Sequence, residues 1–291
     1  MHMLNNSLLL ALAALVLAGL VAACSPMTAL NAAAPSGTHT KTADVRYGAG
    51  PRQLLDIYKP SITAPAGGWP VVVFFYGGSW NSGQRADYAF VGEAMASRGI
   101  LTLVADYRLY PEVRFPDFLR DSAAALAWGL EQAGALGGNP ARVHVMGHSA
   151  GAYNAAMLAF DARWLSACGH WTEQLADFVG LAGPYDFLPI ENPDVKPVFF
   201  HSNYPADSQP LALASAAGPR SFFGAAMTDS LVNPQRNTVA LAGKLQGLGV
   251  RVEIKLYERV NHITLVGAFA VPLRWLVPVL DDVAAFVNEA S

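Results

Sequence analysis

The 291-residue sequence has few cysteines, few charges and no concentration of positive charge. Its two cysteines are too few for the disulfide framework of a small secreted domain. Lysine and arginine number 19 against 22 acidic residues and form no basic run, which argues against a nucleic-acid partner. The phosphate-binding patterns G-x-x-x-x-G-K and G-x-G-x-x-G are both missing, and no cluster of metal-ligating residues stands out. We therefore expect neither a metal nor an organic cofactor.

Long apolar runs are also scarce, and the main one covers residues 7–23. It is short for a membrane-spanning helix, which needs about 20 residues, and it fits the apolar region of a signal peptide. Residues 1–6 carry no lysine or arginine, which departs from that pattern. The run ends in Val21-Ala22-Ala23-Cys24, which resembles the lipobox of bacterial lipoproteins. The resemblance implies export, lipid attachment to Cys24 and membrane anchoring in the bacterial cell envelope; an ordinary signal peptide or an uncleaved anchor is the alternative.

The rest of the composition is typical of one large globular domain. Hydrophobic residues make up 53% of the sequence, enough for a well-buried core. Residues 24–42 are small and polar and predict a flexible tether. We therefore expect a signal peptide over residues 1–23, a tether over residues 24–42 and a folded domain over residues 43–291. With Cys24 lipidated, Cys168 has no disulfide partner, and we interpret it as a structural cysteine.

Strand-like and helix-like segments alternate along this domain, which predicts an α/β fold with a mostly parallel sheet. Residues 71–76 are continuously apolar, as expected for a central strand that is covered on both faces. The Pro/Asn-rich residues 188–218 interrupt the alternation and suggest an insertion or cap near the site. The expected strands are residues 45–47, 54–58, 71–76, 100–105, 142–146, 178–181, 221–225 and 252–256, and the expected helices are residues 88–98, 115–136, 152–159, 237–248 and 273–289.

The most informative motif is Gly147-His148-Ser149-Ala150-Gly151, which lies between a strand-like and a helix-like segment. This is the G-x-S-x-G pattern of a nucleophile elbow, in which a tight turn holds a serine clear of the sheet. The two glycines let the strand and the helix approach closely around the turn. The N–H of Ala150 can donate to an oxygen that becomes negatively charged during catalysis. We therefore predict that Ser149 is a nucleophile.

A serine nucleophile needs a general base, and the base needs an acid that orients it. In this arrangement the acid and then the histidine follow the serine along the chain. His262 comes shortly after the strand-like residues 252–256, at the edge where a parallel sheet builds its sites. His170 and His201 lie in irregular segments. The sequence therefore favours His262 as the base.

Two aspartates compete for the role of the acid. Asp229 follows the strand-like residues 221–225 and precedes His262 by 33 residues, whereas Asp186 follows the preceding strand. The Gly-Pro pair just before Asp186 is also typical of a simple turn. We favour Asp229 and keep Asp186 as the alternative.

An oxyanion hole requires further backbone N–H groups that face the N–H of Ala150. The loop Tyr76-Gly77-Gly78-Ser79-Trp80 directly follows the first central strand-like segment. Its glycines let the backbone approach a substrate carbonyl. We predict that this loop completes the oxyanion hole.

From about Thr42 onward, the sequence resembles the α/β-hydrolase fold. Within that fold it is similar to the hormone-sensitive-lipase-like carboxylesterases and to their feruloyl-esterase and arylformamidase relatives. The resemblance implies a mostly parallel sheet with helices on both faces and a small cap or insertion. The motifs that carry it are Leu55-Asp56-Ile57-Tyr58-Lys59-Pro60, Gly77-Gly78-Ser79-Trp80, Asp106-Tyr107-Arg108-Leu109, Phe115-Pro116-Asp117, Gly137-Gly138-Asn139-Pro140, residues 147–151, Gly183-Pro184-Tyr185-Asp186, and Asp229 with Val232.

The same resemblance implies a role for each site residue. It implies Ser149 as the nucleophile, His262 as the base and Asp229 as the acid. The implied oxyanion donors are Gly78, Ser79 and Ala150, with Gly77 as a further candidate. Ester hydrolysis follows, with small acyl groups favoured and a small-molecule ester as the partner. An arylformamidase-like amide hydrolase with the same triad, and a surface lipoprotein that uses the fold only for binding, are the alternatives.

Two positions depart from the pattern of these relatives. Tyr76 stands where their loop usually begins with histidine, which changes the side chain that anchors the loop. The segment Phe223-Gly224-Ala225-Ala226 stands where the strand before the acid usually ends in His-Gly. Asp106 and Arg108, which match the pattern, are expected to form a structural ion pair.

Overall fold

The computed structural model describes residues 30–31, 37–200 and 202–289. The predicted signal peptide over residues 1–23, the predicted lipidation site Cys24, and His201 lie outside these residues. Within the described part of the chain, no helix is long and apolar enough to cross a membrane.

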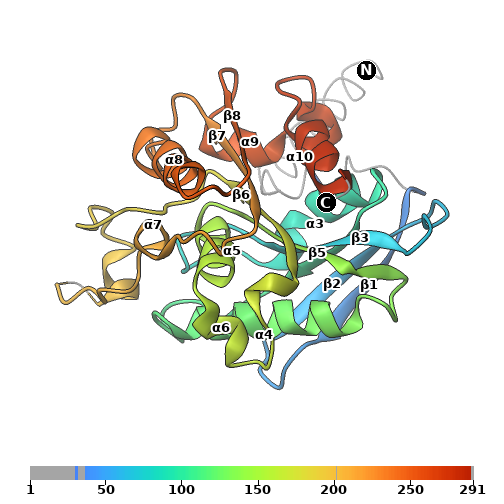
Figure 1. The fold of residues 1–291 in the computed structure, drawn as a ribbon, viewed down its shortest axis with the longest axis horizontal. Helices are drawn as coiled ribbons and strands as arrows, with labels where there is room; N and C mark the ends of the chain where they lie inside the picture. Colours follow the sequence, from blue (N-terminus) through green and yellow to red (C-terminus); the bar gives the residue numbers. More distant parts are fainter. Residues whose placement is uncertain (1–29, 32–36, 201, 290–291) are drawn as a thin grey trace, which may run out of the picture.

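One eight-stranded sheet forms the centre of the domain, with the strand order β1-β2-β4-β3-β5-β6-β7-β8 (Figure 1). The first two strands form an antiparallel hairpin that joins β4, and all pairs from β4 to β8 are parallel. The predicted α/β class with a mostly parallel sheet is confirmed. The strands are β1 (His39–Arg46), β2 (Leu54–Pro60), β3 (Trp69–Phe75), β4 (Leu101–Ala105), β5 (Gly138–His148), β6 (Leu175–Leu181), β7 (Arg220–Ala226) and β8 (Val252–Tyr257).

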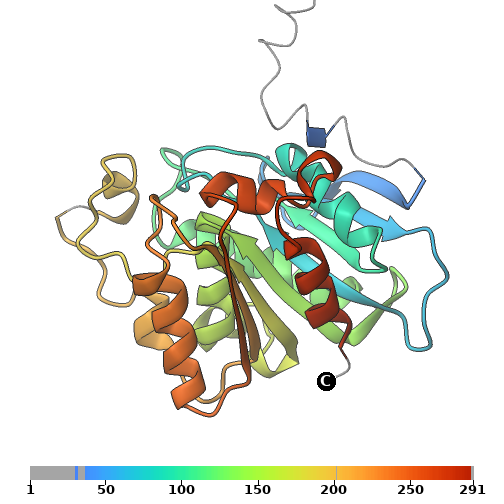
Figure 2. The same cartoon turned by 90° about the horizontal axis from the view of Figure 1, so that it is seen from above.

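Helices cover both faces of this sheet (Figures 1 and 2). On one face α3 packs on β2 and β4 and also touches α10. On the other face α5 packs on β3, β5 and β6, next to α4, and α7 links α5 to α8. The α-helices are α3 (Ala89–Ala96), α4 (Asp117–Gln132), α5 (Ala150–Phe160), α6 (Ala162–Ser166), α7 (Pro210–Leu213), α8 (Ala240–Gly247), α9 (His262–Gly267) and α10 (Val279–Asn288).

Burial on both faces explains the composition of the central strands. Every residue of β3 is buried, and β4 is buried along its whole length. Such strands need apolar side chains at consecutive positions, because helices take up both sides of the sheet. The segment expected as a strand over residues 221–225 has a weak pattern, yet it forms the buried strand β7, which spans seven residues.

The structure corrects two predicted boundaries. Strand β1 begins at His39 and pairs with β2, so the folded domain starts before the predicted position 43. Asn31 also binds the domain, because it donates to the Ala86 carbonyl at 2.8 Å. The final helix, predicted over residues 273–289, is shorter in the structure, where it is α10 with Pro278 at its N-cap position. It begins only after Pro278 because proline interrupts a helix interior.

The parallel strands place their carboxyl ends at one edge of the sheet, which we call the carboxyl edge. The segments that leave β3, β5, β7 and β8 there carry the predicted site residues. Figure 2 shows α9 lying across this edge, above the ends of the strands.

Candidate active site

Ser149 lies at a strained turn between β5 and α5. Its φ of 53° and ψ of −122° are costly for a non-glycine residue, and such strain is concentrated at functional sites. The neighbouring glycines allow the turn: a Cβ on Gly151 would lie 2.0 Å from the Phe75 carbonyl oxygen, and one on Gly147 would lie 2.2 Å from that of Gly151. The Ser149 N–H donates to the Leu181 carbonyl at 2.8 Å, which ties the turn to β6. This is the geometry of a nucleophile elbow.

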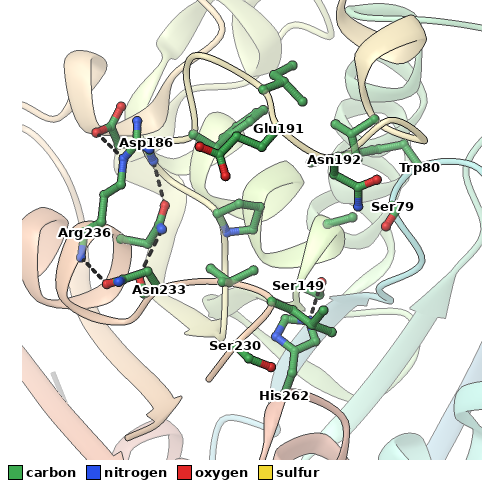
Figure 3. A pocket seen from close by; sticks show the side chains of 18 of the residues that line it. Ser79, Trp80, Ser149, Asp186, Glu191, Asn192, Ser230, Asn233, Arg236 and His262 are labelled. Atoms are coloured by element: carbon green, nitrogen blue, oxygen red, sulfur yellow. Dashed lines mark hydrogen bonds and ion pairs between the residues drawn. The ribbon is translucent and has the colours of Figure 1, made fainter. Parts of the chain in front are cut away.

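His262 contacts Ser149 directly. Its Nε2 lies 2.7 Å from Ser149 Oγ, and both residues line one cavity (Figure 3). His262 is the first residue of α9, and Asn261 caps this helix by accepting hydrogen bonds from the N–H groups of Ile263 and Thr264. The cap fixes the backbone of His262 at the helix start, which aims the imidazole at Ser149.

Asp229 binds the other nitrogen of the same imidazole. Its Oδ2 lies 2.7 Å from His262 Nδ1, while Oδ1 accepts from the N–H groups of Leu231 and Val232. Burial alone would raise the pKa of Asp229, but the hydrogen bonds from His262 and the two N–H groups outweigh it and lower the pKa. The carboxylate therefore stays ionised beside the imidazole.

Asp186, the alternative acid, has a different partner. Its Oδ2 forms an ion pair with Arg236 Nε at 3.0 Å, at the end of the cavity away from His262 in Figure 3. The N–H of Asp186 also donates to Asn237 Oδ1 at 2.8 Å. The structure therefore brings Asp229, and not Asp186, to His262.

His148 is a site residue that the sequence reasoning did not single out. Its ring is fully buried, and its Nε2 lies 2.9 Å from the carbonyl oxygen of His262, to which it donates. Burial lowers the pKa of His148 to about 3, so the ring is neutral at physiological pH. This hydrogen bond adds to the Asn261 cap in fixing the backbone of His262. The only available signal was the position of His148 inside the G-x-S-x-G motif.

The predicted oxyanion residues surround Ser149. Ser79 and Ala150 line the same cavity as Ser149. Gly77 packs directly against the nucleophile, because a Cβ on it would lie 2.9 Å from Ser149 Cβ. Gly78 has a φ of 136°, which is suited to glycine, and it shapes the turn that presents Ser79. The loop and the start of α5 therefore face each other across the serine.

Tyr76, which replaces the expected histidine, anchors this loop from beneath. Its ring stacks on Tyr107 and Tyr88 at centroid distances of 4.9 and 5.5 Å. Its hydroxyl donates to Asp106 at 2.9 Å and accepts from Arg52 at 2.7 Å. The Tyr107 hydroxyl in turn donates to the Tyr76 carbonyl at 2.8 Å. These buried contacts of Tyr76 fix the start of the oxyanion loop.

The predicted ion pair between Asp106 and Arg108 is wrong, because each residue has another partner. Asp106 pairs with Arg85. Arg108 makes a two-pronged contact with Asp121, at 2.7 Å from Nε to Oδ2 and 2.8 Å from Nη2 to Oδ1. Two adjacent ion pairs therefore brace the chain that follows β4, and neither lines the cavity.

The cavity above Ser149 has a volume of about 340 Å³. Its walls combine Trp80 and Phe187, whose rings stack at 6.0 Å, with the polar pair formed by Asp186 and Arg236. The segment predicted as a cap contributes a wall of this cavity. The cap residues that line it are Pro189, Ile190, Glu191, Asn192 and Val195.

The remaining candidates lie elsewhere. His170 contacts Glu131 at 3.2 Å, and Cys168 is a free, half-buried thiol whose pKa is raised by burial. Among the residues that the structure describes, no three histidine, cysteine, aspartate or glutamate side chains form a group that could hold a metal ion.

The fold is that of an α/β-hydrolase. The family model and the relatives named as esterases place the chain in the hormone-sensitive-lipase-like carboxylesterase group. The sequence profile of the BD-FAE family matches residues 55–235, more than half of the chain, and the chain therefore belongs to the BD-FAE family.

Individual relatives agree with this assignment. A probable isoprenylcysteine alpha-carbonyl methylesterase of Oryza sativa subsp. japonica is 30% identical over 243 residues, which cover 76% of this chain and 56% of that protein. Carboxylesterase NlhH of Mycobacterium tuberculosis is 43% identical over 96 residues, which cover 32% of this chain and 30% of that protein.

The chain spans about a third to just over half of the length of such curated relatives. Among solved structures, Pyrobaculum calidifontis esterase matches with a TM-score of 0.71 at 20% identity, covering 90% of this chain and 88% of that one. This likeness concerns the fold.

Proposed function

We propose that the protein hydrolyses carboxylic esters through an acyl-enzyme on Ser149. The observation that carries the proposal is the unbroken hydrogen-bonded series from Asp229 through His262 to Ser149, with 2.7 Å at each contact. An ester is the substrate class because relatives of the chain are named esterases and carboxylesterases.

In the first half-reaction, Ser149 Oγ attacks the carbonyl carbon while His262 Nε2 takes its proton. Asp229 holds the imidazole in the orientation that leaves Nε2 free to accept, and it stabilises the imidazolium that forms. The N–H groups of Ala150, Gly78 and Ser79, with Gly77 as a further candidate, stabilise the tetrahedral oxyanion. His262 then gives its proton to the leaving alcohol.

In the second half-reaction, a water molecule takes the position of the alcohol. His262 removes a proton from the water as it attacks the acyl carbon, and Ser149 leaves with that proton. The products are a carboxylic acid and the free enzyme. No metal or organic cofactor enters either step.

We propose short acyl groups as the preferred substrates. The support is the preference for small acyl groups that the resemblance to hormone-sensitive-lipase-like carboxylesterases implies, together with the aromatic wall beside the oxyanion loop. Trp80 is almost fully buried, and it packs edge-on against Tyr153 and Phe199 at about 5 Å. Its indole N–H also donates to Asn154 at 2.9 Å. A wall held at so many points leaves little freedom to open a groove for a long chain.

We also propose that the protein is exported and held at a membrane of the bacterial cell envelope by lipid on Cys24. The support is the apolar run over residues 7–23 and the Val21-Ala22-Ala23-Cys24 sequence at its end. Mass spectrometry of the N-terminal peptide from protein made in a bacterial host tests this: a diacylated Cys24 is expected, and an unmodified Met1 would contradict it.

Hydrolysis of p-nitrophenyl acetate, butyrate and decanoate by wild type and by Ser149→Ala tests the activity and the acyl preference. We expect the wild type to hydrolyse the acetate or the butyrate faster than the decanoate, and we expect loss of turnover in the variant. If the folded wild type does not hydrolyse these esters and does not react with a fluorophosphonate probe, the hydrolase proposal is wrong and the binding alternative stands. Labelling by the probe without ester turnover would point to the arylformamidase-like alternative, which an N-formyl arylamine substrate then tests.

A further inference from the structure

Several large apolar side chains are exposed at the carboxyl edge of the sheet, where the cavity also lies. Leu231, Ile263 and Trp275 are 68%, 62% and 71% exposed, and Met227 and Val271 are exposed as well. All five lie in segments that follow β7 or β8 at the carboxyl edge. We call Met227, Leu231, Ile263, Val271 and Trp275 the apolar rim. Exposed apolar groups that gather in this way mark a surface that contacts another apolar body.

The members of the apolar rim are linked through the same few elements. Leu231 lines the cavity together with His262, and Ile263 is the next residue after that histidine. The N–H of Met227 donates to the Tyr257 carbonyl at 2.8 Å, and Trp275 lines one groove with Tyr257. One end of the rim therefore lies at the cavity, with Leu231 and Ile263, and the other end lies at the groove that Trp275 shares with Tyr257.

The start of the described chain indicates what covers this rim. Leu30 packs on the core and lies beside Gly267 at the end of α9, and Asn31 accepts from the N–H of Phe90 at 3.0 Å. Figure 2 shows this segment, in dark blue, on the same side of the sheet as α9. Cys24 precedes Leu30 by six residues, which span at most about 20 Å. A lipid on Cys24 would therefore hold α9 close to the bilayer.

The charges beside the rim are balanced. The groove next to Trp275 is lined by Arg259 and Arg274 on the basic side and by Glu258 and Asp281 on the acidic side. Such a surface gains little from anionic headgroups, so its contact with lipid depends on apolar burial and on tryptophan at the interface. The rim is therefore suited to zwitterionic phosphatidylcholine, with little dependence on salt.

We infer that the apolar rim is a lipid-contact surface, which holds the mouth of the Ser149 cavity against the membrane. Esters dissolved in the bilayer would then enter the site directly from the lipid phase. The orientation rests on the lipid anchor proposed above, whereas the apolar contact itself does not.

A fluorophore that reports polarity tests the rim. It is attached to the full-length chain through Trp275→Cys in a Cys168→Ser background. The matched control is Trp171→Cys: Trp171 is 61% exposed, but it precedes β6 and so lies at the opposite edge of the sheet. After reconstitution into phosphatidylcholine vesicles, we expect a blue shift and a gain in intensity at position 275, little change at position 171, and no loss of the shift in high salt.

The outcomes separate the proposals. Equal spectra at the two positions on vesicle-bound protein would overturn the rim while leaving the lipid anchor intact. A shift at position 275 in protein that also carries Cys24→Ser, and so has neither the lipid nor a second thiol, would support the rim without the anchor. The absence of both flotation with vesicles and a shift would overturn the rim. Hydrolysis of p-nitrophenyl acetate by the same samples reports the proposed activity separately.

A second experiment links the rim to substrate access. Val271→Ser with Trp275→Ser removes apolar surface that does not line the cavity. We expect a several-fold loss in the hydrolysis of a butyrate ester embedded in phosphatidylcholine vesicles and unchanged hydrolysis of soluble p-nitrophenyl butyrate. Equal rates of wild type and variant on both substrates would contradict the proposal.

Discussion

Among the residues that the structure describes, two buried histidine–aspartate pairs differ in what surrounds them. His262 and Asp229 meet at 2.7 Å at the carboxyl edge of the sheet. His144 and Asp177 lie 2.8 Å apart, deeper between β5 and β6. Both aspartates have a pKa that burial would raise but that their partners lower. The chemistry of the pair alone therefore does not distinguish a site from a structural contact.

The third partner makes the difference. His262 faces Ser149 and a cavity, so its second nitrogen is available to a reacting group. Asp177 is instead bound by Arg220, with contacts of 2.5 Å from Nε and 2.8 Å from Nη2, and the Arg220 guanidinium also lies over the Phe286 ring. Asp177 and Arg220 therefore form a bidentate ion pair in the core. Location at the carboxyl edge is what gives the first pair its proposed function.

The largest expected effect separates the two aspartates by their influence on turnover. Asp229→Asn leaves the shape of the site intact but orients His262 wrongly, so we expect kcat to fall by about 10⁴. Asp177→Asn is expected to leave the kcat of the folded fraction unchanged. Steady-state hydrolysis of p-nitrophenyl acetate, normalised to the folded fraction of each protein from its circular dichroism, measures both. Similar losses of kcat in the two variants would break the comparison.

The second prediction concerns stability, for which we expect the Asp177 ion pair to matter more than an exposed one. Arg220→Met leaves the Asp177 carboxylate buried without its strongest partner, and removal of one partner from a buried ion pair costs about 3–5 kcal/mol. We expect the free energy of unfolding in urea to fall by that amount, with kcat retained below the transition. Arg236→Met, which removes an ion pair that is about 40% exposed, serves as the control and should change stability by less than about 1 kcal/mol. Equal changes in the two variants would show that Asp177 is not a structural anion.

The distinction between these two pairs could be predicted only in part from the sequence. Ser149, Asp229 and His262 follow separate strands, and the order of these strands along the chain favoured all three but left Asp186 open as the alternative acid. The structure places the three side chains in that hydrogen-bonded order. His144 and Asp177 gave no signal, because a contact between neighbouring parallel strands depends on register, and residue spacing along one chain does not report it.

Other parts of the site could not be predicted from the sequence for similar reasons. The sequence predicted a histidine after β8 but not the helix α9 that begins at His262, since this helix has only six residues. The contact from His148 to the carbonyl of His262 spans 114 positions and has no local pattern. The strands were predictable because their apolar runs reflect burial on both faces. The predicted helix boundary near Pro278 differs from the observed one because a proline, which lacks an N–H, interrupts a helix.

The third prediction concerns the pH dependence of stability. Burial lowers the pKa of His144 below its usual 6.5 despite the nearby Asp177, so the folded protein holds this ring neutral while the unfolded chain protonates it. The unfolded state then binds more protons, and the free energy of unfolding falls as pH drops below about 6.5. We expect His144→Gln to reduce this slope by up to about 1.4 kcal/mol per pH unit. Urea unfolding between pH 5 and 8 measures it, and an unchanged slope would contradict the assignment of a neutral ring.

The smallest expected effect concerns Asp186, an aspartate that shares the cavity with His262 but does not touch it. Its partner Arg236 is itself 43% exposed, and ion pairs that are partly open to water contribute about 0–1 kcal/mol. Asp186→Asn should therefore change kcat/KM for p-nitrophenyl acetate by less than tenfold. A loss of about 10³ or more, with Asp229→Asn nearly unaffected, would assign the orienting role to Asp186. The result would then show that the cavity rearranges when substrate binds, since Asp186 is held by Arg236 in the free protein.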